Sequence, residues 1–277
     1  MAGEIGEFQH IRIEREDGLT WLILNRPEKR NATHPPLHFE MQRALTALET
    51  DPDTGVLVLT GAGDSFCAGQ DLKEYFRALD ADPVGRARAR KASHDWTWER
   101  LWLFPRPTIA MVNGYCFGNA FTPLVACDFA IAAEDAIFGL SEINWGIFPG
   151  GLVSRVVADV LSYRDALYYI LTGRPFDGRK AAELRLVTYA VPRAELRAET
   201  VKLARELLGK NPYALRAAKE AYKLCRLMDY AQAYNYLTAK SAELRGADPE
   251  HGREQGIRQF IDEKRYRPGF ESYQRGG

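Results

Sequence analysis

Cysteine is scarce in this sequence, and its spacing does not suggest pairing. Four cysteines occur among 277 residues, at positions 67, 116, 127 and 225. They form no CxxC pair and lack the density of a small domain held by disulfides. We therefore expect free, buried thiols in a protein of a reducing compartment.

Metal-ligand motifs are also missing. The five histidines form no HExxH motif and no cluster with cysteine. His34 and His38 are four residues apart, but no carboxylate or thiol lies in ligand register with them. We interpret them as surface histidines and predict no metal site.

Long apolar runs and an excess of one charge are absent as well. No stretch reaches the roughly 18–20 apolar residues that a membrane-spanning helix needs, and the polar start MAGEIGEFQH does not resemble a signal peptide. Lys plus Arg equals Asp plus Glu at 37 each, which gives no support to a nucleic-acid or polybasic membrane surface. We expect a cytoplasmic protein with neither nucleic-acid nor membrane partners.

Two common enzyme motifs are incomplete. The segment GAGDSF (61–66) lacks the third glycine of a dinucleotide-binding fingerprint, and no GxxxxGK[ST] occurs. Ser65 is followed by Phe-Cys, so the GxSxG motif of many hydrolases fails too. These absences weaken the nucleotide-enzyme and serine-hydrolase interpretations.

What the sequence does contain is a repeated alternation of short strands and helices. Residues 11–24 alternate apolar and polar positions around Asp17-Gly18, which predicts a hairpin. The pattern predicts further strands at 56–60, 108–112, 129–132 and 136–140. It predicts helices at about 36–50, 84–104, 122–127, 151–161, 163–172 and 178–184. Gly173 would end the helix at 163–172. We expect an α/β domain of stacked ββα units, followed by a helical region from about residue 193.

Two glycine-containing loops each follow a buried strand. They read SFCAGQDL (65–72) and GYCFGNAF (114–121), and each leads into a helical segment. Free main-chain N–H groups at a helix start bind anions, and two such donors facing each other would hold a carbonyl that becomes an enolate. The alternative is two tight turns, because glycine-rich loops are common.

The stretch SEINWGIFPGG (141–151) places one carboxylate, Glu142, in an apolar environment. A buried, unpaired carboxylate has a raised pKa, which is typical of proton-transfer groups. We expect Ile143, Trp145 and Phe148 to raise this pKa. The alternative is a helix-capping or salt-bridged carboxylate.

Four segments in order resemble the enoyl-CoA hydratase/isomerase, or crotonase, superfamily. They are LNRPEKRNA (24–32), SFCAGQDLKE (65–74), NGYCFGNAFTPLVACD (113–128) and FGLSEINWGIFPGG (138–151). They most closely resemble hydroxycinnamoyl-CoA hydratase-lyases, which convert feruloyl- or coumaroyl-CoA to an aromatic aldehyde and acetyl-CoA. The resemblance implies a crotonase-like spiral of ββα units over residues 1–200. It also implies a helical trimerisation region over 201–277, packed on its own or a neighbouring subunit of a trimer or dimer of trimers.

The resemblance also implies where an acyl-CoA thioester binds. The main-chain amides of Gln70 and Asn119 would form the oxyanion hole, where the family usually has Met and Gly. Coenzyme A would arrive as part of the substrate, so no separate cofactor is expected. Residues implied in holding it are Lys29, Ala68 and Leu72, together with Phe260 and Lys264 from a tail that often reaches across a subunit boundary. Further substrate contacts are implied at Ser141, Gly150 and Trp145, the last as a pocket wall.

The number of carboxylates bears on the reaction. Plain hydratases of the superfamily use two Glu, and Thr122 occupies the position of the first. Only Glu142 remains, which suits one group acting as acid and then as base, as in hydratase-lyases and several isomerases. Thr122 would position water, or would only cap the helix that begins near Pro123.

The resemblance therefore implies hydration of a 4-hydroxycinnamoyl-CoA followed by retro-aldol cleavage. Tyr75 matches a family tyrosine that contacts the phenol, whereas Thr238 replaces a second one. Because a site built to bind a hydroxyl discriminates strongly, Thr238 predicts either a shifted substrate preference or the loss of lyase activity. The alternatives are a single-Glu hydratase or isomerase for another acyl-CoA, and a scaffold without catalytic activity.

Overall fold

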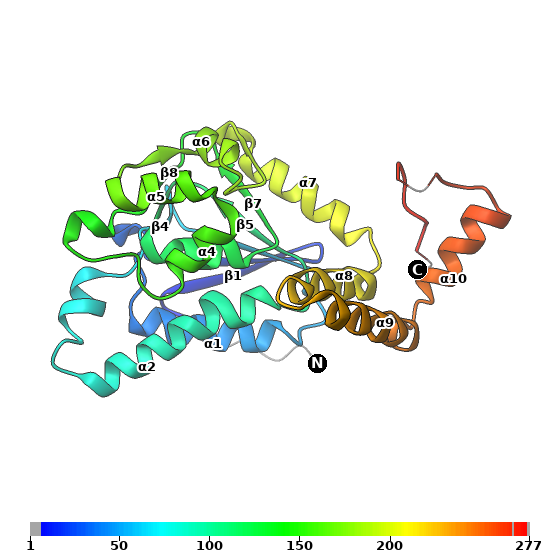
Figure 1. Ribbon diagram of the computed structural model, residues 1–277, viewed down its shortest axis with the longest axis horizontal. Coiled ribbons are helices and arrows are strands. Elements are labelled where there is room, and N and C mark those ends of the chain that lie inside the picture. The colour runs from blue at the N-terminus through cyan, green and yellow to red at the C-terminus, as the bar shows by residue number, and fades with distance from the viewer. Residues whose placement is uncertain (1–6, 268, 276–277) are drawn as a thin grey trace.

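Two β-sheets form the centre of the fold in the computed structural model, which describes residues 7–267 and 269–275 (Figure 1). The strand order of the larger sheet is β1-β2-β3-β5-β7-β10. Its strands are β1 (Ile11–Glu16), β2 (Leu19–Leu24), β3 (Val56–Gly61), β5 (Thr108–Val112), β7 (Phe129–Ala133) and β10 (Tyr189–Val191). The smaller sheet is ordered β4 (Ser65–Cys67), β6 (Tyr115–Phe117), β8 (Ile137–Gly139) and β9 (Phe176–Asp177).

The sheets confirm the predicted ββα units. After the antiparallel β1–β2 hairpin, each neighbouring pair in the larger sheet is parallel. The chain passes from β3 to β4, from β5 to β6 and from β7 to β8, so each buried strand is followed by a short strand of the second sheet. Parallel sheets covered on both faces are continuously apolar, and every residue of β2 and β3 is buried.

Helices cover both sheets at or near the predicted positions. They are α1 (Pro35–Leu48), α2 (Pro83–His94), α3 (Phe121–Ala126), α4 (Val153–Val160), α5 (Tyr163–Thr172), α6 (Gly178–Glu183), α7 (Leu196–Leu208), α8 (Pro212–Cys225), α9 (Tyr230–Ala247) and α10 (Gly252–Ile257). Short 3₁₀ or π turns are η1 (Pro27–Lys29), η2 (Leu72–Arg77), η3 (Asp95–Arg100), η4 (Gly118–Ala120), η5 (Glu142–Trp145), η6 (Arg193–Glu195) and η7 (Arg258–Asp262). The helix predicted at 84–104 is α2 continued by η3, and α5 ends at Gly173 as expected.

The interpretation of His34 and His38 as surface residues is wrong. Their exposed fractions are 3% and 0%. His34 precedes α1 and His38 lies within it, and α1 is packed against β1, α2 and η3. The histidines are buried because elements distant in sequence cover this helix.

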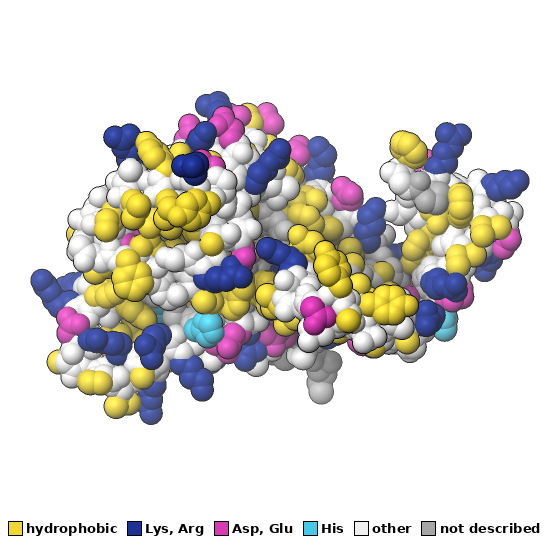
Figure 2. All heavy atoms as spheres, viewed as in Figure 1, with side chains coloured by type: hydrophobic (Ala, Val, Ile, Leu, Met, Phe, Trp, Pro, Cys, Tyr) yellow, Lys and Arg dark blue, Asp and Glu magenta, His cyan; other side chains and the backbone are white. Residues whose placement is uncertain are grey.

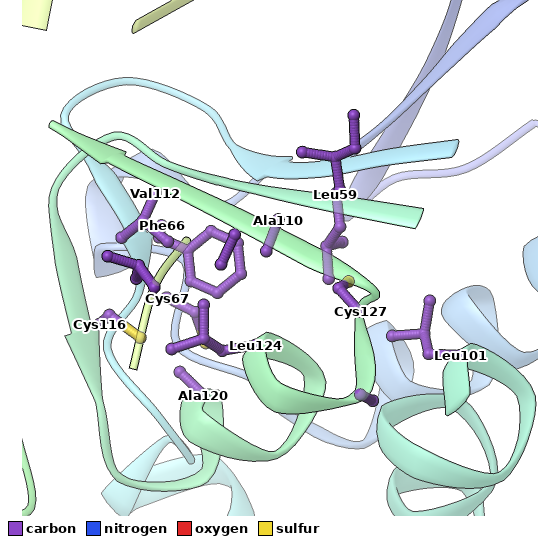
Figure 3. Close-up of a cluster of buried hydrophobic side chains, with 14 of the residues drawn as sticks. Leu59, Phe66, Cys67, Leu101, Ala110, Val112, Cys116, Ala120, Leu124 and Cys127 are labelled. Atoms are coloured by element: carbon purple, nitrogen blue, oxygen red, sulfur yellow. The ribbon is translucent and has the colours of Figure 1, made fainter. Parts of the chain in front are cut away.

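A hydrophobic cluster includes buried residues of the two glycine-containing loops (Figure 3). Phe66 and Cys67 of β4 and Cys116 of β6 are at most 2% exposed and belong to this cluster. All four cysteines are free, as predicted, although Cys225 is only partly buried. Burial raises the pKa of the Cys67 thiol to about 12, so it packs as a neutral group. The loops thus begin on a close-packed base.

The C-terminal helices are joined to the α/β body by buried charge. Lys219 and Lys223 of α8 bind the carboxylate of Asp128 at 2.8 and 2.6 Å. The α8–α9 pair then leads to α10, which lies apart from the sheets (Figure 1). None of the helices that the structure describes is both long and apolar enough to cross a membrane.

Candidate active site

A cavity of about 1210 Å³ gathers residues from all four motifs. Its walls come from the loops after β4 and β6, from η2 and α2, and from the segment after β8. The predicted site residues that line it are Ala68, Gln70, Leu72, Tyr75, Asn119, Thr122, Ser141, Glu142, Trp145 and Gly150. Segments far apart in the chain therefore meet at one hollow, as the motif order implied.

The two glycine-containing loops touch each other at Gly69. A Cβ built on Gly69 would lie 2.8 Å from the Phe117 carbonyl oxygen and 3.6 Å from the Asn119 nitrogen. Gly69 also has a φ of +89°, a conformation that side chains disfavour. Only glycine permits this approach, which brings the main chain of Gln70 close to that of Asn119.

The direction of the Gln70 main-chain N–H follows from a bridge to Thr33. The Thr33 N–H donates to the Gly69 carbonyl, and the Asp71 N–H donates to the Thr33 carbonyl, both at 2.8 Å. Because N–H groups alternate in direction along extended chain, the N–H of Gln70 points away from Thr33. Asn119 lies in η4, where a helix begins and its first N–H groups have no partner within the helix.

Glu142 is the only carboxylate among the described residues that line the cavity. Its side chain packs against Gly118, since a Cβ there would lie 3.1 Å from Oε1. Its Oε2 is buried and has no hydrogen-bond partner among the described residues. Burial raises the pKa of this carboxyl above its usual value of 4.5.

The three residues expected to raise the pKa of Glu142 are themselves partly exposed. Ile143, Trp145 and Phe148 are 43%, 64% and 75% exposed. Trp145 and Phe148 nevertheless line the same cavity as Glu142, whose side chain packs against the loop at Gly118. The direction of the pKa shift is as predicted, and the contribution of these three neighbours to it stays a prediction.

Thr122 is not a helix cap. The N-cap of α3 is Ala120, and Thr122 is the second residue of the helix. Its side chain is buried, and its Oγ1 has no hydrogen-bond partner in the described part of the chain. Thr122 and Glu142 thus each offer an unpaired oxygen in the wall of one cavity, and unpaired buried polar atoms are uncommon outside functional sites.

The Gln70 side chain enters a buried polar network that the sequence did not reveal. Its Oε1 is 3.0 Å from His38 Nε2 and 3.0 Å from Thr33 Oγ1. Its Nε2 donates to Ser93 Oγ at 3.3 Å. The Trp96 indole N–H donates to His38 Nδ1 at 2.8 Å. No local motif marks these residues, because they come from three separate elements.

Tyr75 lies in η2 at one side of the cavity. Its half-buried ring is edge-on to His38, with ring centroids 5.7 Å apart. Burial raises the pKa of the phenol, and the charges of Arg90 and Arg86 oppose this shift. Arg90 also lines the cavity, together with Arg30 and Lys91, which sequence reasoning missed.

The remaining predicted binding residues do not line the cavity of the same chain. Lys29 is exposed in η1, next to Arg30, whose guanidinium lies 4.4 Å over the Tyr115 ring. Thr238 is exposed on α9, where its hydroxyl donates to the Tyr234 carbonyl. Phe260 in η7 and Lys264 beyond it are exposed in the C-terminal segment.

Metal ligands do not gather in the part of the chain that the structure describes. No group of three or more His, Cys, Asp or Glu side chains there has an arrangement suited to a metal ion.

Comparison with known proteins identifies the family. The model of the enoyl-CoA hydratase/isomerase family matches residues 14–272. The chain is 54% identical to a hydroxycinnamoyl-CoA hydratase-lyase of Pseudomonas fluorescens, with 98% of each chain covered. It is 35% identical to a probable enoyl-CoA hydratase of Mycobacterium tuberculosis, over 77% of this chain and 81% of the relative.

Solved structures agree with this assignment. An enoyl-CoA hydratase from Bacillus anthracis superposes with a TM-score of 0.83 at 30% identity, covering 92% of this chain and 97% of that one. An enoyl-CoA hydratase structure from Geobacillus kaustophilus gives a TM-score of 0.84 at 28% identity, covering 95% and 98%. The predicted crotonase-like fold is confirmed, and the chain belongs to the enoyl-CoA hydratase/isomerase family.

Proposed function

We propose that this protein hydrates a 4-hydroxycinnamoyl-CoA thioester and cleaves the product to an aromatic aldehyde and acetyl-CoA. The observation that carries this proposal is the single carboxylate, Glu142, opposite two adjacent main-chain amide loops in one cavity. The 54% identity to a hydroxycinnamoyl-CoA hydratase-lyase supports the choice of substrate class.

In this proposal the thioester oxygen accepts hydrogen bonds from the N–H groups of Gln70 and Asn119. Negative charge develops on that oxygen whenever the carbon next to the thioester becomes nucleophilic. Donors already placed around it stabilise this charge most in the transition state. The close approach of the two loops at Gly69 supports the proposal that both donors reach one oxygen.

Hydration needs a base and then an acid. Glu142 takes a proton from water as the oxygen adds to Cβ, and the double-bond electrons move into the thioester enolate. The protonated Glu142 then returns the proton to Cα, which gives the β-hydroxy thioester. In this proposal Thr122, whose Oγ1 has no hydrogen-bond partner among the described residues, would hold the attacking water beside Glu142.

Cleavage repeats the same proton cycle. Glu142 takes the proton of the β-hydroxyl, the Cα–Cβ bond breaks, and its electrons pass into the acetyl-CoA enolate. The aldehyde leaves, and Glu142 protonates the enolate carbon to give acetyl-CoA. A carboxyl whose pKa is raised by burial exchanges protons more readily near neutral pH.

The aromatic ring would lie toward Tyr75, whose hydroxyl would bind the para-hydroxyl of the substrate. A para-hydroxyl assists cleavage, because quinone-methide character spreads charge at Cβ. Ala68, Leu72, Ser141, Trp145 and Gly150 would contact the acyl chain or coenzyme A along the cavity wall.

Coenzyme A would arrive as part of the substrate, with no separate cofactor. Its phosphates would lie near the cations Lys29, Arg30 and Lys91. We further propose a trimer or a dimer of trimers in the cytoplasm, in which Thr238, Phe260 and Lys264 face a neighbouring subunit's cavity. Exposed hydrophobic side chains on α8 and α9, including Tyr222, Tyr234 and Leu237, support such an assembly (Figure 2).

Incubation of the purified protein with feruloyl-CoA tests the function. We expect the absorbance of the conjugated thioester to fall while chromatography detects vanillin and acetyl-CoA in equal amounts. A β-hydroxy thioester without aldehyde would instead support a hydratase. In parallel, Glu142→Gln should lower kcat by about 10²–10⁴-fold with little change in KM, and retention of most activity would contradict the mechanism.

A further inference from the structure

We propose that Trp96 and His38 form a positioning relay that holds the Gln70 side chain and thereby aims the Gln70 main-chain N–H at the thioester oxygen. This inference rests on the proposed function, because it takes Gln70 as one of the two oxyanion donors. Neither Trp96 nor His38 lines the cavity, so both would act through Gln70.

The hydrogen bonds of the relay have one consistent direction. An indole nitrogen only donates, so the Trp96 N–H at 2.8 Å requires a free lone pair on His38 Nδ1. In a neutral imidazole the proton then resides on Nε2. His38 Nε2–H therefore donates to Gln70 Oε1 at 3.0 Å.

Burial keeps His38 in this neutral form. His38 and Trp96 are both 0% exposed. Burial lowers the pKa of His38 to about 4, and the hydrogen bond to Gln70 only partly opposes the shift. The tautomer set by Trp96 is therefore the form present near neutral pH.

The same contacts fix the orientation of the Gln70 amide. Its oxygen accepts hydrogen bonds from His38 Nε2–H and from the Thr33 hydroxyl. The same hydroxyl also lies within donating distance of the Gly69 carbonyl, at 3.2 Å. Its NH₂ group faces the Ser93 oxygen. A flipped amide would place two donors against each other at His38, at an energetic cost typical of unpaired buried polar groups.

The hydrogen bonds of the Gln70 side chain restrain the main chain next to Gly69. Gly69 precedes Gln70 and has a φ of +89°, so the loop has no side chain of its own to resist rotation there. The Thr33 bridge holds the amides on either side of the Gln70 residue. The side-chain network adds a third restraint, which preorganises the N–H before charge develops on the substrate.

A double-mutant cycle between Trp96→Phe and Gln70→Met separates positioning from general packing. Trp96→Phe removes the indole donor, so the proton is free to move to His38 Nδ1 and Gln70 loses its donor from Nε2. We expect kcat to fall about tenfold while KM changes less than twofold. The loss is smaller than the roughly 10²–10³-fold loss on removing an oxyanion donor, because the donor itself is still present. Gln70→Met keeps the main-chain N–H but removes every side-chain bond, and should lower kcat at least as much.

The decisive result is non-additivity. In the Gln70→Met background, Trp96→Phe should have little further effect on kcat, since the relay no longer has a target. An equal, additive loss in both backgrounds would overturn the relay. Trp98→Phe is the matched control, because Trp98 also lies in η3 but stacks on Trp102, and it should leave kcat unchanged.

Nitrogen-15 NMR of the histidines provides a readout that needs no activity. At pH 7, His38 should have a protonated Nε2 and an unprotonated Nδ1, and Trp96→Phe should shift this equilibrium toward Nδ1–H. A charged His38, or a protonated Nδ1 in the unmodified protein, would overturn the relay. If feruloyl-CoA is not a substrate, this spectrum still decides the relay, while the turnover assay alone decides the proposed function.

Discussion

The carboxylate of Glu142 packs against the α-carbon of Gly118, with Oε1 only 3.1 Å from where a Cβ would be. The residue after this glycine, Asn119, supplies one of the two proposed oxyanion donors. The proposed acid/base group therefore packs against the proposed oxyanion loop, so we expect a change in one to displace the other.

Gly118→Ala should reduce turnover and stability together. The new methyl would meet Glu142 Oε1, and the φ of +53° would cost about 1–2 kcal/mol for any residue with a side chain. Steady-state kinetics and urea unfolding measure the two effects. Gly269→Ala is the control for the backbone alone, since its φ is +93° and a Cβ there meets no atom within 4 Å. Equal loss of activity in both variants would show that the Glu142 contact is unimportant.

Glu142→Gln should change how stability depends on pH. The folded-state pKa of Glu142 is raised, so ionising it costs stability as the pH rises above its unfolded value of 4.5 and through the folded pKa. Glutamine removes that cost. The difference in Tm between variant and unmodified protein should therefore be small near pH 4 and favour the variant near pH 8. A difference that is largest at pH 4 would contradict the buried state of this carboxyl.

The buried histidines should make the protein sensitive to acid. Burial lowers the pKa of His34 to about 3 and that of His38 to about 4, from 6.5 in both cases. The stability that follows from keeping them neutral is complete above pH 6.5 and is lost as the pH falls toward 4. Tm measured from pH 7 to pH 4 should decrease, and the decrease should be smaller in His38→Gln. An unchanged slope in that variant would assign the acid sensitivity to other groups.

Thr238→Tyr should increase selectivity for substrates with a para-hydroxyl. If α9 faces a neighbouring cavity in the assembly, the new phenol would restore a hydrogen-bond partner. One such bond changes kcat/KM about three- to tenfold. The ratio of kcat/KM for coumaroyl-CoA to that for cinnamoyl-CoA measures the effect. No change in this ratio, with the oligomer intact, would mean that position 238 does not contact the ring.

Local pattern alone predicted a large part of this protein. Many strand and helix positions follow from side-chain periodicity, and the alternation of strands and helices predicted the ββα units. The short strands β4 and β6 lie in segments predicted as loops. The motif segments predicted the cavity wall, because loops that follow parallel strands end at the same edge of a sheet. The lone Glu142 was visible as a carboxylate in an apolar stretch.

Other features depended on contacts between distant segments. Trp96 and His38 are 58 residues apart, so no window of the sequence shows that η3 packs against α1 and that Trp96 meets the buried His38. The resemblance implied Trp145 as a pocket wall, but only the tertiary structure shows that Phe148 lines the same cavity as Trp145 and Glu142. The hydrophobic pattern of the sequence indicates which side chains tend to be buried. Only the tertiary structure determines which polar groups are buried with them. The tertiary structure gave Gln70 its partners, and it left Glu142 and Thr122, which line one cavity, each with a buried oxygen that has no partner among the described residues.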